Sequence, residues 1–97
     1  MKRTVPRLEG DARQVARGEL IGLAVAIVHS SDPGLVGLQG TVVDETLRTL
    51  VIRRADGRES RIGKVGSTFG FPGPHGTVQV PGEAIEFRPA ERTKKVR

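Results

Sequence analysis

The chain has 97 residues, no cysteine, no tryptophan or tyrosine, and a formal net charge of +5. This length provides room for one small domain, and the lack of cysteine excludes disulfides and thiolate metal sites. No apolar run approaches the roughly 20 residues of a membrane-spanning helix, and the basic start is not followed by a signal-peptide core. We therefore expect a cytoplasmic protein that makes no membrane contact.

The positive charge is concentrated toward the two ends of the chain. Residues 1–17 carry five basic and two acidic side chains, residues 86–97 again carry five and two, and residues 18–85 carry six and seven. Basic ends on a compact domain are typical of a protein that binds a polyanion, because lysine and arginine displace counterions from phosphates. The alternative is that these charges serve solubility alone.

Residues 1–19 are predicted to form a basic arm and a short amphipathic helix. From residue 8 to residue 19 the apolar side chains recur at steps of three and four, and Gly18 lies near the end of the segment. A helix of this length is marginal in water, so its apolar stripe should pack on the rest of the protein or on a partner. The predicted partner-binding residues are Leu8, Ala12, Val15, Ala16 and Leu20.

Residues 20–87 are predicted to form a small, strongly bent antiparallel β-barrel of the Sm-like or SH3-like kind. The first strand begins at Leu20, where the apolar period changes to two, and turn-forming residues at 29–35 lead into a second strand at 38–44. Glycines at 34, 37 and 40 supply the backbone freedom that a tightly curved strand pair needs. The fold class is therefore mainly β.

Short segments in which apolar and polar residues alternate predict the remaining strands of the barrel, which would then have six or seven strands in all. Further strands are expected at residues 49–54 and 59–64, around Phe69 and Phe71, and at 77–80 and 84–87, where the last would close the barrel. Asp56-Gly57 predicts a hairpin turn with positive φ at both positions. Residues 88–97 form a basic tail, in which Pro89 could begin a helix through Lys95.

Patterns for catalysis are weak. His29 beside Ser30 and Ser31 is the nearest approach to a nucleophile and base, and nothing in the pattern orients that imidazole. Acids at 44–45 and at 56 and 59 are typical of strand ends and turns, and neither phosphate-binding glycine motif is present. We predict no catalytic residue, no metal ligands and no cofactor in this chain.

Arginine dominates the basic residues, accounting for 12 of 16. Its planar fork binds phosphate oxygens and stacks on bases, whereas the three phenylalanines alternate as core residues do. One group of basic residues surrounds the predicted hairpin, and a second group lies in the C-terminal tail. The acids at 56 and 59 could form salt bridges with the first group, which would then not contact RNA. The predicted RNA-binding residues are Arg53, Arg54, Arg58, Arg61, Lys64, Arg88, Arg92, Lys94 and Lys95.

An ordered series of motifs resembles the archaeal ribonuclease P protein component 1 family, whose eukaryotic counterparts are shared by ribonucleases P and MRP. The series is ELIGL at residues 19–23, DPGLVG at 32–37, GTVVDET at 40–46 and TLVI at 49–52. It continues through Lys64, Phe69, Phe71, Gly82 and the Arg88-Pro89-x-x-Arg92 tail, and so covers nearly all of the chain.

The resemblance implies an Sm-like barrel with terminal helices and a noncatalytic RNA-binding subunit of the enzyme that removes 5′ leaders from precursor tRNA. The implied partners are ribonuclease P RNA, a zinc-ribbon ribonuclease P protein subunit and other holoenzyme proteins. The RNA is the implied catalyst, so magnesium would be needed by the RNA. One departure is the small residues Gly22, Ala24 and Ala26, where relatives often alternate with charged residues.

Two other functions remain open. The Gly37-x-x-Gly40-x-Val42 step is also similar to KOW-type modules, which indicates a ribosomal or transcription-associated RNA-binding barrel. An SH3-like barrel could instead be a protein-interaction adaptor without an RNA role.

Overall fold

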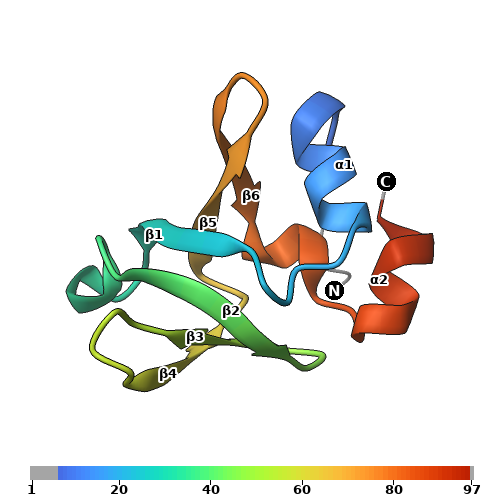
Figure 1. The fold of residues 1–97 in the computed structure, drawn as a ribbon. Helices are drawn as coiled ribbons and strands as arrows, with labels where there is room; N and C mark the ends of the chain where they lie inside the picture. Colours follow the sequence, from blue (N-terminus) through green and yellow to red (C-terminus); the bar gives the residue numbers. More distant parts are fainter. Residues whose placement is uncertain (1–6, 97) are drawn as a thin grey trace.

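The computed structural model describes residues 7–96, and in this part of the chain one six-stranded antiparallel sheet is joined to a short helix at each end (Figure 1). The helices are α1 (Gly10–Arg17) and α2 (Pro89–Lys95). Two 3₁₀ turns, η1 and η2, span Pro33–Leu35 and Gly82–Ile85. The strands are β1 (Ala24–Ser30), β2 (Gln39–Glu45), β3 (Thr49–Arg53), β4 (Glu59–Gly63), β5 (Ser67–Gly73) and β6 (Gly76–Pro81). Neither helix in these residues is long and apolar enough to cross a membrane.

The sheet is strongly bent, and its strand order is β4-β3-β2-β1-β5-β6. The register shifts between Ile27 and His29 and again between Val42 and Asp44, as expected where a sheet bends sharply. A Cβ atom at Gly40 would collide with the carbonyl oxygen of Arg53, so β3 can approach β2 this closely only because residue 40 is glycine. The predicted mainly β, barrel-like fold is confirmed.

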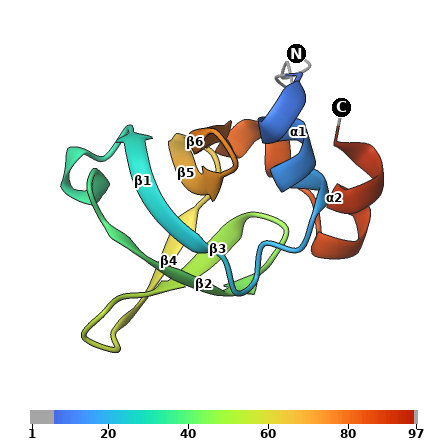
Figure 2. The same cartoon turned by 45° about the horizontal axis from the view of Figure 1, so that its top comes forward.

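The inner face of the sheet and both terminal segments share one core. Phe69, Phe71 and Leu50 are fully buried, and Leu8, Ala16 and Leu20 from the N-terminal segment join the same cluster. Helix α1 contacts β5, β6 and α2, and Figure 2 shows both helices gathered at the β6 side of the sheet.

The predicted use of the N-terminal stripe for partner binding is wrong for Leu8, Ala16 and Leu20, and stays a prediction for Ala12 and Val15. Leu8, Ala16 and Leu20 are buried within the chain itself, and Ala12 and Val15 are half-buried against the same core. A sheet of this size leaves apolar surface uncovered, and the chain's own helix covers it. Of the predicted basic arm, residues 1–6 lie outside the described residues.

The expected closing strand at 84–87 is also wrong. Residues Gly82–Ile85 form the 3₁₀ turn η2, in which the neighbours Ala84 and Ile85 are both buried. Two consecutive buried side chains do not fit the period of two in a half-exposed strand. Pro81 ends β6, and the sheet stops there on this side.

The hairpin at residues 54–58 is confirmed, but its predicted turn type is not. Gly57 has φ +87°, whereas no described non-glycine residue, Asp56 included, has positive φ. The Gly57 N–H donates to the Arg54 carbonyl at 2.9 Å, and the Arg54 N–H donates to the Arg58 carbonyl at 2.8 Å. This three-residue loop needs only one left-handed residue. The C-terminal helix at Pro89–Lys95 lies where it was predicted.

Candidate nucleic-acid interface

The β3–β4 hairpin carries most of the exposed arginines of the sheet. Arg53 lies opposite Glu59 in the ladder, and its Nε and Nη2 donate to one carboxylate oxygen at 3.1 and 2.6 Å. The pair is about half exposed, so Arg53 is accessible but partly neutralised. This contact is the salt-bridged alternative that the sequence left open, and the pair of Arg58 with Asp56 is a second, longer instance of it.

The other hairpin arginines have weaker partners. The Arg58 side chain is 80% exposed, and its Nε lies 3.7 Å from Asp56 Oδ2. Arg61 donates from Nη1 to the Thr49 hydroxyl at 3.3 Å, a contact that orients the guanidinium without neutralising it. Arg54 is exposed at the start of the loop. We call Arg54, Arg58 and Arg61 the hairpin surface.

Arg48 is an exposed residue of this ribbon that the sequence analysis did not single out. Its carbonyl accepts the Lys64 N–H at 2.8 Å, which places it at the end of the β3–β4 ladder away from the loop. Only the strand register brings residues 48 and 64 together, so no local motif could have marked Arg48.

Lys64 does not belong to this surface, which corrects the prediction. Its side chain is fully buried, and its ammonium donates to Glu45 Oε2 at 2.9 Å, the Thr46 carbonyl at 2.8 Å and the Phe87 carbonyl at 3.1 Å. All three donors of the ammonium are used inside the protein. Burial lowers the pKa of Lys64 below its ordinary value of 10.5, while its hydrogen bond to Glu45 raises that pKa in part.

Arg92 is the second predicted RNA-binding residue that is buried. Its side chain is 1% exposed, and its Nε and Nη2 donate to the two oxygens of Glu45, each at 2.8 Å. Its Nη1 donates to the carbonyls of Ala16 and Gly18, the latter at 2.7 Å. This arginine therefore joins α2 to the end of α1 and to β2, and is unavailable to a ligand.

We call Glu45, Lys64 and Arg92 the buried ion cluster. Buried charges are costly unless they are paired and fully hydrogen-bonded, and both conditions are met here. Among the described residues, no buried side-chain nitrogen or oxygen lacks a hydrogen-bond partner. The signal available in the sequence was Glu45 itself, an acid at the end of an apolar strand.

The remaining tail residues lie on the outside of α2. Arg88, Lys94 and Lys95 are exposed, and the Lys95 ammonium lies 3.9 Å from Glu91, one helical turn away. We call these three residues the C-terminal surface. The loop between β3 and β4 and helix α2 lie at opposite ends of the molecule in both views (Figures 1 and 2).

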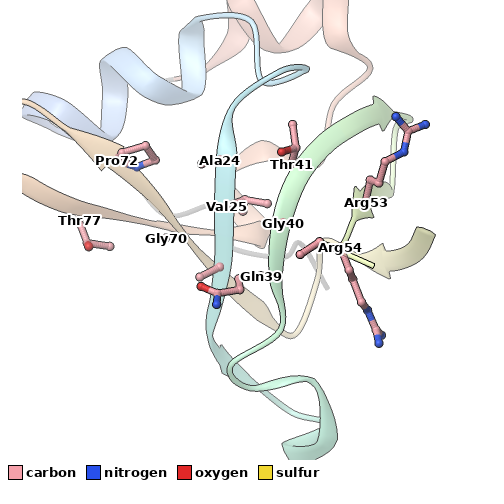
Figure 3. A pocket seen from close by; sticks show the side chains of 12 residues that line it. Ala24, Val25, Gln39, Gly40, Thr41, Arg53, Arg54, Gly70, Pro72 and Thr77 are labelled. Atoms are coloured by element: carbon pink, nitrogen blue, oxygen red, sulfur yellow. The ribbon is translucent and has the colours of Figure 1, made fainter. Parts of the chain in front are cut away.

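An open groove of about 550 Å³ crosses the outer face of the sheet (Figure 3). Its lining contains small or uncharged residues such as Ala24, Ala26, Gly70 and Thr77, and two arginines at one side. The side chains of Arg53 and Arg54 are directed away from the strands at that side. Two of the small residues noted in the sequence, Ala24 and Ala26, thus face outward and leave this face hollow.

The site offers positive charge and hydrogen-bond donors. Among residues 7–96, no group of three histidine or acidic side chains lies together in a way that could hold a metal ion. Exposed guanidinium groups on a protruding β-ribbon suit contacts with phosphate oxygens.

A bent antiparallel sheet, helices closing it at one side and exposed arginines on a ribbon define a small barrel-like protein with a basic β-ribbon. The family described as Ribonuclease P/MRP, subunit p29 matches residues 13–95, and the chain belongs to this family. This confirms the resemblance found in the sequence motifs.

Individual relatives agree with the family. The chain is 49% identical over 87 residues to ribonuclease P protein component 1 of Desulfurococcus amylolyticus, covering 89% of this chain and 95% of the relative. It is 45% identical over 84 residues to the protein of the same name from Methanothermobacter thermautotrophicus, covering 86% and 90%. The solved structure of Mth11, a homologue of human RNase P protein Rpp29, matches with a TM-score of 0.55 and 44% identity, covering 77% of this chain and 97% of the other.

Proposed function

We propose that this chain is a noncatalytic RNA-binding subunit of ribonuclease P that supports the catalytic RNA in removing 5′ leaders from precursor tRNA. The observation that carries the proposal is the hairpin surface, where three exposed arginines share one ribbon and only one of them lies within 4 Å of a carboxylate in the described residues. Such groups gain affinity from phosphates by releasing counterions.

Salt-dependent binding tests this surface. Arg58→Ala combined with Arg61→Ala should weaken binding to ribonuclease P RNA and lower the slope of log affinity against log salt by up to about two. Folding should be unchanged, because exposed charges contribute little to stability. Arg7→Ala with Arg13→Ala removes the same charge from the N-terminal segment, where both side chains are exposed. An equal effect of the two double variants would mean that net charge alone governs binding.

The proposed role as a noncatalytic subunit has its own test. Reconstitution with ribonuclease P RNA, magnesium and the other protein subunits should give faster precursor-tRNA cleavage than reconstitution without this chain. The proposal assigns magnesium to the RNA, so the chain without RNA should cleave nothing. Magnesium-dependent cleavage by the protein alone, abolished by Asp44→Asn, would contradict the proposal.

A zinc-ribbon ribonuclease P protein subunit is the direct partner we propose, in the cytoplasm. Since Leu8, Ala16 and Leu20 are occupied by the chain's own core, this partner would bind mainly at another surface. Amides that gain protection from hydrogen exchange on partner binding should then lie mainly outside residues 8–20. An adaptor without an RNA role would show the protection but no salt-sensitive RNA affinity.

A further inference from the structure

The groove on the outer face of the sheet is built by the strand register. Ala24 of β1 lies opposite Thr41 of β2, which in turn lies opposite Arg53 of β3. Ala26 lies opposite Gln39, which adds a second row of side chains on the same face. Residues directly opposite each other in an antiparallel pair share one side of the sheet. Because both β1 residues are alanines, a hollow remains between the longer side chains around them (Figure 3).

The lining of the groove carries positive charge and polar groups but no acid. Among the described residues, the lining includes two arginines and no aspartate or glutamate. Arg53 is paired with Glu59, whereas Arg54 forms no ion pair with any residue from 7 to 96. The polar groups of the lining can both donate and accept hydrogen bonds, and they belong to Gln39, Thr41 and Thr77.

An unpaired ribonucleotide matches these features part by part. Its base has an apolar ring face and polar edges, and its phosphate is an anion. Bases inside a duplex are stacked and paired, whereas unpaired bases can be splayed out and held by hydrogen bonds and guanidinium planes. The groove volume of about 550 Å³ lies within the roughly 300–1,000 Å³ of sites for small molecules. An apolar segment of a protein would instead leave Arg54 at the side of the groove without an anion.

The groove is continuous with the hairpin surface, because Arg54 belongs to both. The Arg54 N–H donates to the Arg58 carbonyl at 2.8 Å, so the two arginines are neighbours across the hairpin. An RNA strand whose phosphates lie along the hairpin surface therefore passes the side of the groove. We infer that the groove receives an unpaired base of this RNA strand. The inference rests on the proposed function and adds to it the kind of RNA, a single-stranded segment beside the hairpin.

Nuclear magnetic resonance of the full chain separates base contact from phosphate contact. The probes are a single-stranded oligouridylate, whose bases are unpaired, and an RNA duplex of the same length. The single strand should shift the methyl signals of Ala24, Ala26 and Thr77 in the groove. The duplex should shift the amide signals of Arg58 and Arg61 and leave these methyl groups unmoved, because its bases cannot enter the groove.

A variant that fills the groove without changing charge gives the second test. Ala24→Leu alters an exposed position in the lining and should weaken binding of the oligouridylate by about tenfold, the loss of one base contact. The slope of log affinity against log salt should stay the same, because no phosphate contact is removed. The matched control is Ala90→Leu, at an exposed alanine of α2. Gln39→Ala, which adds no bulk, should weaken binding in the same direction.

The outcomes distinguish this inference from the proposed function. Groove methyl signals that stay unmoved while the Arg58 and Arg61 amides shift would overturn the base site and leave RNA binding in place. Equal methyl shifts from single strand and duplex, or equal affinities of Ala24→Leu and Ala90→Leu, would overturn it too. Methyl shifts caused only by the zinc-ribbon subunit would make the groove a protein-binding surface instead. If neither RNA shifts any signal, the proposed function fails as well.

Discussion

Arg58 and Arg92 carry the same guanidinium group in opposite surroundings. Arg58 is 80% exposed on the hairpin, with a carboxylate at 3.7 Å, whereas Arg92 is 1% exposed and bonded to both oxygens of Glu45. The difference arises from Glu45, which is 47 positions away in the sequence from Arg92. A count of basic residues therefore overstates the binding surface, because some cations are neutralised by distant acids inside the fold.

The two environments also differ in what they contribute to folding. An exposed pair contributes about 0–1 kcal/mol, because water already solvates both charges. Inside the protein the cost of desolvation is large, and a pair that is broken by removing one partner leaves an uncompensated charge. The buried ion cluster holds one anion and two cations, so its single carboxylate is the member on which both others depend.

The largest expected effect is that of Glu45→Gln. Lys64 and Arg92 would then face each other as buried cations without a counter-charge, which should lower the free energy of unfolding by about 3–5 kcal/mol. A small domain has only about 5–15 kcal/mol in total, so much of its stability would be lost. Urea unfolding of the wild-type protein and the variant measures this loss in the free energy of unfolding.

Two arginine variants provide the matched comparison. Arg92→Met should cost about as much as Glu45→Gln, because it also unpairs the carbonyls of Ala16 and Gly18. Arg58→Met removes the same group from the hairpin and should change stability by less than about 0.5 kcal/mol. Similar losses for the two arginines would show that the buried ion cluster is no more important to folding than an exposed charge.

The next effect is steric and concerns Gly82→Ala. A Cβ at residue 82 would overlap the carbonyl oxygen of Lys64, so the added methyl group should displace the backbone that carries the buried lysine. Overpacking of this kind costs about 1–3 kcal/mol. The control is Gly18→Ala, where the new atom would lie 3.5 Å from its nearest neighbour, an ordinary contact. If the two alanine variants unfold at the same urea concentration, the close approach at residue 82 is not a constraint.

The sequence predicted local features well. Apolar periodicity located α1, β2 and the body of β1, which begins at Ala24 and not at the predicted Leu20, and Pro89 marked the start of α2, because these signals act within one element. Most of the failures depend on which elements meet in space. The burial of Leu8, Ala16 and Leu20 within the chain, the buried state of Lys64 and Arg92, and the 3₁₀ turn at Gly82–Ile85 are set by long-range contacts that leave no local pattern. The turn type at Asp56-Gly57 is a local failure, since only Gly57 has positive φ. The hairpin arginines were placed correctly on a ribbon because Asp56-Gly57 fixes that ribbon locally.

A smaller effect is expected at the boundary between the two environments, where Arg53 is paired with Glu59 in water. Glu59→Gln should change stability by no more than about 1 kcal/mol, because the pair is about half exposed. It should also release Arg53 toward the hairpin surface, tighten RNA binding and steepen the salt dependence by about one unit of slope. Asp56→Asn is the control, since the nearest arginine side-chain atom, Arg58 Nε, is 3.7 Å from that carboxylate, and the amide oxygen of asparagine can still accept the Arg58 backbone N–H. Weaker RNA binding by Glu59→Gln would show that Arg53 does not contact phosphate.

The smallest effect is the pH dependence contributed by Lys64. Burial lowers its pKa in the folded protein below the ordinary value of 10.5, so the unfolded chain binds this proton more tightly than the folded protein does. Stability contributed by this group is therefore fully present above the unfolded pKa and is lost as the pH falls through the folded pKa. As the pH is raised toward 10.5, the wild-type protein should gain stability relative to Lys64→Met, which keeps the side-chain volume and leaves Glu45 paired with Arg92. The chain has no cysteine or tyrosine, so few other groups titrate in this range. Urea unfolding of both proteins across alkaline pH gives the difference between their free energies of unfolding. If the wild-type protein instead became less stable relative to Lys64→Met as the pH rises, attraction to Glu45 would outweigh burial in setting the pKa of Lys64.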